Sequence, residues 1–167
     1  MVPNNFRKVK CLEDLDQLAK SFLPEALWEF GSVGVEHNVS REANRQVFDN
    51  IWLQPRILKN VSQRSIKRSL FNHPYNLPVG ISPMGASAMF GFEADLNFAR
   101  AAKEINVPYL MSGSALVPME KVVEVNSNVW FQAYVDADRD SIRLLTDRVW
   151  RSGIKNLVIT VDVPVPG

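Results

Sequence analysis

The chain has 167 residues, 46% of them hydrophobic and 22% charged, which is an ordinary composition for a globular protein with one core. Nineteen basic and eighteen acidic residues leave a formal net charge of +1, so composition gives no electrostatic case for nucleic-acid binding. A single cysteine, Cys11, excludes an internal disulfide and a cysteine-based zinc site.

No apolar run approaches the roughly 18 residues of a membrane span, and the first ten residues do not resemble a signal peptide. We therefore expect a cytoplasmic protein. A peroxisomal or membrane-associated location stays open, because a signal beyond residue 167 would be invisible in this sequence.

Residues 1–76 are expected to form a helical and partly irregular region. Helical spacing of apolar residues from Leu12 to Phe22 predicts a first helix. Pro24 is suited to open a second, short helix that Gly31 would end. Residues 51–58 look extended, and the two histidines, His37 and His73, lie in turn-like stretches without a matching metal partner or nucleophile.

Residues 77–167 alternate between strand-like and helical patterns. The four apolar, strand-like runs are residues 77–83, 108–113, 129–135 and 157–163. The helical stretches between them are residues 91–105, with Phe92, Leu96, Ala99, Ala102 and Ile105 on one face, residues 117–125, and residues 136–153. This alternation predicts parallel strands with right-handed crossovers, which both a doubly wound sheet and a (β/α)8 barrel satisfy.

Small and polar residues gather where each predicted strand ends. Gln132 and Tyr134 share one face of their strand, as do Thr160 and Asp162. The first strand is followed by "PMGASAMFG", which lacks the G-x-G-x-x-G turn of a dinucleotide-binding sheet. Polar groups at the carboxyl ends of successive parallel strands are typical of a barrel mouth, so the pattern favours the barrel.

The stretches "WFQAYVDADRD" and "LVITVDVPVPG" together resemble the FMN-dependent 2-hydroxy acid oxidase and dehydrogenase family, which includes glycolate oxidase and the lactate and mandelate dehydrogenases. The likeness extends upstream through "FARAAKEINVPYLMSGSA" and "LPVGISPMGASAMF" to about Leu23. It implies an α/β fold: the amino-terminal half of a (β/α)8 TIM barrel, residues 77–167, after a helical preface, residues 1–76. It also implies an FMN cofactor across the barrel mouth.

The resemblance assigns roles to individual side chains. The backbone of Pro83, Met84 and Gly85 would face the flavin ring near N5. Ser112, Gln132 and Thr160 would hydrogen-bond the edge of that ring. Tyr134 would contact both substrate and flavin, and Asp162 would orient a catalytic histidine on a later strand, as carboxylates do in other histidine-centred sites.

Two positions depart from the family pattern. Phe30 stands where a tyrosine usually contacts the substrate carboxylate, and losing that hydrogen bond would cost about 1.5–3 kcal/mol of binding. Ser114 stands where glycolate oxidases often carry a large side chain, so we expect room for a bulkier substrate. The resemblance implies that Phe30 and Ser114 are substrate-binding positions. No metal site is expected.

The predicted reaction of the full-length protein is FMN-dependent oxidation of an (S)-2-hydroxy acid to the 2-oxo acid. The sequence leaves oxygen, a quinone or a cytochrome open as electron acceptor, and the resemblance implies a homo-oligomer. The family's later arginine, lysine and histidine are not in these residues, so we expect the isolated chain to be inactive. The alternatives are a non-catalytic half-barrel without flavin and another kind of FMN barrel.

Overall fold

The computed structural model describes residues 9–135 and 138–162. The chain divides into two compact units, the first ending at Ser62 and the second beginning at Gln63. The sequence had suggested a boundary after residue 76, so the two divisions differ by a hairpin that the structure groups with the second unit.

The first unit consists of α1 (Leu12–Phe22), α2 (Glu25–Ser32), α3 (Val39–Gln46) and a 3-10 turn, η2 (Val47–Asn50). Acidic residues in the first turn of α1 and Lys20 in its last turn complement the helix dipole. Pro24 is the N-cap of α2, as its fixed φ favours, but the helix continues through Gly31 to Ser32. The prediction that Gly31 ends this helix is therefore wrong by one residue.

The sequence interpretation missed α3, because residues 35–42 look like a turn. Asn38 begins this helix with a left-handed backbone (φ 61°), and its side-chain oxygen accepts a hydrogen bond from the Gly34 N–H at 2.7 Å. Asparagine tolerates that conformation better than most residues. Asn38 is therefore typical of a turn in the sequence, although it begins a helix in the structure.

The second unit opens with an antiparallel hairpin of β1 (Arg68–Leu70) and β2 (His73–Tyr75). Phe71 and Asn72 link the strands, both with positive φ, as two-residue hairpin turns of the primed type require. Phe71 and the buried Tyr75 make edge-on ring contacts with Trp130, with centroids 5.1 Å and 6.5 Å apart. These contacts attach the hairpin to the main sheet.

The main sheet contains β3 (Leu110–Met111), β4 (Trp130–Ala133) and β5 (Leu157–Ile159), which are parallel and adjacent in chain order. The first predicted strand is reduced to one parallel bridge between Ile81 and Tyr109. A side chain on Gly80 would lie 2.8 Å from Pro108, so glycine permits this close approach. Within residues 9–135 and 138–162, the strand order shows no reversal of the kind that marks a doubly wound sheet.

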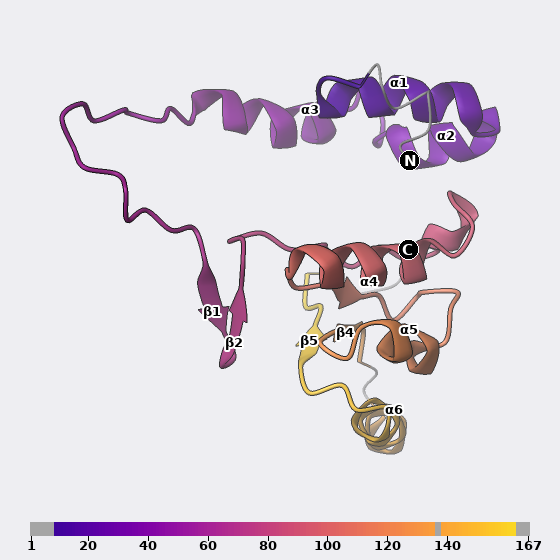
Figure 1. The fold of residues 1–167 in the computed structure, drawn as a ribbon. Helices are drawn as coiled ribbons and strands as arrows, with labels where there is room; N and C mark the ends of the chain where they lie inside the picture. The colour runs from indigo at the N-terminus through magenta and orange to yellow at the C-terminus, as the bar shows by residue number, and fades with distance from the viewer. Residues whose placement is uncertain (1–8, 136–137, 163–167) are drawn as a thin grey trace. The chain divides into compact units, whose positions relative to one another are not determined.

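Each crossover contains a helix: α4 (Ala94–Ile105), α5 (Met119–Val125) and α6 (Arg139–Arg151) (Figure 1). The core lies between these helices and the sheet, and it includes Leu96, Ala99, Ala102, Tyr109, Met111, Val122, Val129, Phe131, Ala133, Val149 and Ile154.

The apolar face predicted for α4 needs correction at both ends. Phe92 precedes the helix and is 87% exposed, and Ile105 in the last turn is also exposed. Helical spacing continues past the point where the sheet stops covering the helix, so periodicity overestimates the buried length.

Coverage of the sheet decreases toward β5. Ala133 and Ile159 are register partners and share a face, yet Ala133 is buried whereas Ile159 is exposed, together with Leu157 and Val161. No helix of the described residues is both long and apolar enough to cross a membrane.

Candidate functional site

A hydrogen-bonded network joins the carboxyl ends of the parallel strands. Its centre is Gln132, whose side chain is buried at the end of β4. Its Nε2 donates to Thr160 Oγ1 at 2.7 Å, and its Oε1 accepts from the Gly113 N–H at 3.2 Å and from Ser112 Oγ at 3.4 Å. One buried amide therefore links the ends of three successive strands.

The network continues to the segment that follows Ile81. Ser112 Oγ accepts a hydrogen bond from the Ser114 N–H at 3.1 Å, and the Ser114 carbonyl accepts one from the Ala86 N–H at 3.0 Å. The structure thus brings together five residues predicted for the site: Gly85, Ser112, Ser114, Gln132 and Thr160.

Strand register and glycine positions explain why these residues meet. Gln132 is the register partner of Val158, and Thr160 lies two residues further along the same face. A side chain on Gly113 would lie 2.8 Å from the Gln132 carbonyl oxygen. A side chain on Gly85 would lie 3.2 Å from Ser114 Cβ. Gly113 therefore lets the Gln132 backbone, and Gly85 lets the Ser114 side chain, approach more closely than other residues allow.

The remaining predicted residues lie outside this network. Tyr134 and Asp162 follow Gln132 and Thr160 by two residues, are exposed, and have no hydrogen bond or ion pair with another described residue. Pro83 and Met84 lie in the segment before Gly85 and are partly or largely exposed. Phe30 lies on α2 and therefore belongs to the first unit.

A buried polar pair, Tyr109 and Asp95, was not predicted from the sequence. The Tyr109 hydroxyl donates to Asp95 Oδ1 at 3.1 Å, and both side chains are almost fully buried. Burial, followed by the nearby Asp95 carboxylate, raises the pKa of Tyr109 far above its ordinary value, so this phenol stays neutral. The pair joins the first turn of α4 to the start of β3, fourteen residues apart, and has a structural role.

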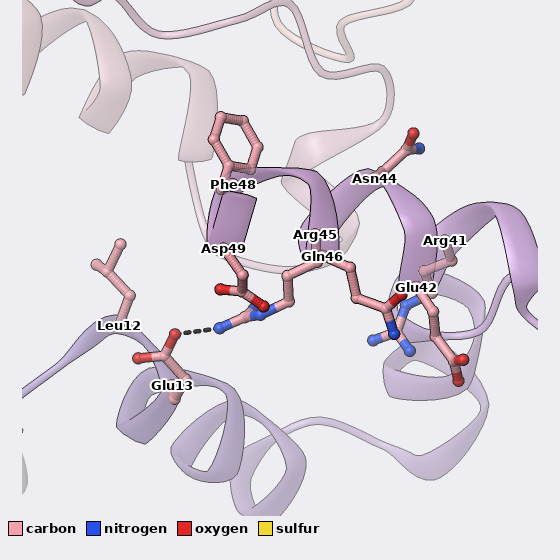
Figure 2. Close-up of a pocket in the computed structure, with 9 residues that line it drawn as sticks. All are labelled: Leu12, Glu13, Arg41, Glu42, Asn44, Arg45, Gln46, Phe48 and Asp49. Carbon is pink, nitrogen blue, oxygen red and sulfur yellow. Dashed lines mark hydrogen bonds and ion pairs between the residues drawn. The ribbon is translucent and has the colours of Figure 1, made fainter. Parts of the chain in front are cut away.

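A hollow of about 790 Å³ occurs in the first unit, between α1 and the α3–η2 segment (Figure 2). Arg45 extends from α3 and pairs with Glu13 of α1 across it. Its lining also carries Arg41, Glu42 and Asp49, so both signs of charge are present and no ligand class is favoured. None of the site residues predicted from sequence lines this hollow.

Residues 9–135 and 138–162 contain no group of three or more histidine, cysteine, aspartate or glutamate side chains able to hold a metal ion. The strand-end network instead offers hydrogen-bond donors. Thr160 Oγ1 accepts from Gln132, so its hydroxyl hydrogen is available, and Gln132 Nε2 has a second hydrogen. Donors beside glycine backbone suit a flat ligand with carbonyl or ring-nitrogen acceptors, which is the chemistry of a flavin ring edge.

Most of the chain matches proteins of known family. The profile of the FMN-dependent dehydrogenase family matches residues 19–167. An L-lactate dehydrogenase of Vibrio cholerae serotype O1 (strain M66-2) is 35% identical over 158 residues, which are 92% of this chain and 41% of the relative. An L-lactate oxidase of Nostoc sp. (strain PCC 7120 / SAG 25.82 / UTEX 2576) is 34% identical over 161 residues, 93% of this chain and 44% of the relative.

Solved structures of mandelate oxidases are similar to this chain in fold. A mandelate oxidase crystallised with 3,3-difluoro-2-hydroxy-3-phenylpropionic acid superposes with a TM-score of 0.86 at 30% identity, covering 92% of this chain and 46% of that one. A mandelate oxidase mutant with a C4a-OH-FMN adduct gives 0.83 at 29% identity, covering 91% of this chain and 46% of that one. The chain thus spans less than half the length of these relatives.

Proposed function

Because this chain belongs to the FMN-dependent dehydrogenase family, we propose that it is the amino-terminal part of an enzyme that oxidises an (S)-2-hydroxy acid to the 2-oxo acid. FMN is the cofactor of this family. The observation that carries the proposal is the buried network around Gln132, which places donors and two close-packed glycines at one end of the parallel strands.

This end of the strands would form part of the mouth of a (β/α)8 barrel, with residues 77–167 as its first four units and residues 1–76 as a helical preface. The parallel order of the strands without reversal supports this architecture. Four strands cannot close a barrel of eight, so the remaining strands would come from protein beyond this sequence.

Several residues would hold the flavin. Gln132 and Thr160 would donate to its ring edge, with Ser112 beside them, and the backbone of Pro83, Met84 and Gly85 would lie along the ring. When bound, FMN supplies the acceptor for the two electrons removed from the hydroxy acid. The chain's own contribution is to orient the ring through a network that is already formed.

Tyr134 and Asp162 would provide the chemistry of this half of the site. Their exposure and lack of partners among the described residues leave both polar groups available. Tyr134 would donate a hydrogen bond to the substrate. Asp162 would accept one from a histidine of the completed enzyme, holding that imidazole in position and stabilising it when it gains a proton.

Substrate choice would depend on Phe30 and Ser114. A phenyl ring at Phe30 cannot donate to a substrate carboxylate, and the small Ser114 leaves space beside the strand ends. We therefore propose that the enzyme favours aryl or long-chain 2-hydroxy acids over glycolate. A preference of the full-length enzyme for glycolate would contradict this specificity.

The isolated chain should not turn over hydroxy acids. Its two histidines are His37 in the first unit and His73 in the β1–β2 hairpin, and neither belongs to the strand-end network. A fragment without the general base and the carboxylate clamp has only part of the required machinery.

The test uses the full-length protein loaded with FMN and mixed anaerobically with (S)-mandelate and (S)-lactate. We expect loss of the oxidised-flavin absorbance with at least one substrate. Asp162→Asn should retain FMN and slow this bleaching by orders of magnitude, whereas Asp147→Asn, an exposed change on α6, should leave it unchanged. Failure to retain FMN at all would favour the non-catalytic alternative and overturn the proposal.

A further inference from the structure

A second hollow lies at the opposite end of the strands from the Gln132 network. We call it the hairpin hollow; it measures about 380 Å³, and the β1–β2 hairpin and the loops that precede β4 and β5 line it. All of these segments belong to the second unit. The catalytic proposal uses only the carboxyl ends of the strands, so it leaves the hairpin hollow without a role.

His73 also lines the hairpin hollow, and its Nε2 makes a hydrogen bond with Asn106 Oδ1 at 3.4 Å. Five other polar side chains of the hollow are not used in holding the fold. They are the ammonium of Lys155, the amides of Asn72, Asn128 and Asn156, and the hydroxyl of Ser127. None of these five side-chain groups makes a hydrogen bond or ion pair with another described residue. Groups of this kind that converge on one concave surface are characteristic of a ligand site.

The sign of the charge indicates the class of ligand. Among the described residues that line the hairpin hollow there is no carboxylate, and Lys155 carries the only permanent charge. Amide N–H groups and a hydroxyl can all donate to an anion. Lysine binds phosphate or carboxylate as a point charge, and the surrounding amides add directed hydrogen bonds.

Two almost fully buried residues also line the hollow. They are Tyr75 and Val129, and Tyr75 packs against Trp130. The volume also exceeds that of one small ion and would admit a small anionic metabolite.

We propose that the hairpin hollow binds a small oxyanion, a carboxylate or phosphate group, with Lys155 as the counter-charge and the amides of Asn72 and Asn128 as donors. This site goes beyond the proposed oxidation, because it lies at the other end of the sheet and shares no residue with the strand-end network.

The experiment titrates the full-length protein, loaded with FMN, by isothermal calorimetry with inorganic phosphate and, separately, with acetate. We expect saturable binding of at least one, and the two titrations distinguish phosphate from carboxylate. Lys155→Gln should weaken binding about tenfold or more, because it removes a charge-assisted contact. Asn128→Asp should abolish it by placing a negative charge in the hollow.

Lys121→Gln is the matched control, since Lys121 is an exposed lysine on α5 that does not line the hairpin hollow. This variant should bind like the unmodified protein. Absence of saturable binding, or equal loss in Lys121→Gln and Lys155→Gln, would overturn the proposal. Flavin bleaching by hydroxy acid should be unchanged in Lys155→Gln, so failure of the oxidation proposal and failure of this one give different results.

Discussion

The two units of this chain use their apolar residues differently. In the second unit, α4, α5 and α6 pack against the sheet and bury a continuous core. In the first unit, α1, α2 and α3 have amphipathic sequences, but neither these helices nor η2 contain a buried residue. Short helices are marginally stable without tertiary packing, so the second unit carries its own stability whereas the first depends on a covering surface.

The largest test of this contrast compares one phenylalanine from each unit. Phe131→Ala removes a ring that is 4% exposed in the core, and should lower the free energy of unfolding by about 3–5 kcal/mol. Phe22→Ala removes a ring that is 83% exposed and should change it by less than about 0.5 kcal/mol. Urea unfolding of both variants measures the difference. Equal losses would show that the helices of the first unit are already packed.

The buried Tyr109–Asp95 pair sharpens the comparison inside the second unit. Tyr109→Phe should cost about 1–3 kcal/mol, because it leaves the buried Asp95 carboxyl without its hydrogen bond. The raised pKa of Tyr109 also predicts a pH effect. Its contribution is complete below the unfolded-state pKa of about 10 and is lost as pH rises above it, because unfolding then allows the phenol to ionise.

Thermal unfolding between neutral and alkaline pH would measure this dependence. The unmodified protein should lose stability above about pH 10, whereas Tyr109→Phe should show a smaller decline. Parallel curves for the two proteins would contradict the assignment of that decline to Tyr109.

An effect of similar size is expected at Gly113, beside the strand-end network. Gly113→Ala places a methyl group 2.8 Å from the Gln132 carbonyl oxygen and should cost about 1–3 kcal/mol, with weaker FMN retention by the full-length protein. Gly91→Ala is the control, since a side chain there has open space within 4 Å. It should be neutral or stabilising by about 0.4–1 kcal/mol. Unfolding and FMN dissociation measure the two consequences.

The smallest effect concerns the start of α6. Asp138 accepts a hydrogen bond from the Ser141 N–H at 2.8 Å, and the interactions with Ser141 lower the pKa of Asp138. A carboxylate with a lowered pKa stabilises the fold above its unfolded-state pKa and loses that effect as pH falls through the folded-state value. Asp138→Ala should therefore reduce stability at neutral pH more than in acid. Asp140→Ala, two residues further on in the first turn of α6, is the control for charge alone.

Much of the second unit follows from local pattern. The alternation of strand and helix patterns predicted the crossover helices. Gln132 and Thr160 were both predicted for the carboxyl ends of their strands, and the hydrogen bond between their side chains shows that these ends lie side by side. The helical stretch predicted over residues 136–153 contains α6, whose N-cap is Asp138. These features depend on residues near one another in sequence or on strand geometry, which the sequence displays directly.

The features that were missed depend on longer-range packing. Helical period could not show that Phe92 lies beyond the covered part of α4, because coverage depends on where the sheet ends. No local pattern distinguished Asp95, because its hydrogen bond joins it to Tyr109, fourteen residues further along the chain. The first strand shrank to one bridge at Ile81, since pairing with one neighbour gives a short run little support.

The uncovered face of β5 has a practical consequence for anyone who produces this chain by itself. Leu157 and Ile159 on this strand, and Val161 just after it, present branched apolar side chains, and the strand pairs with β4 and with no other described strand. Such an edge can recruit the same segment from another molecule, so concentrated preparations should form sheet-like assemblies that bind thioflavin T. Ile159→Lys should suppress this assembly, because it places a charge on the exposed edge, and should leave the pairing of β3 with β4 unchanged.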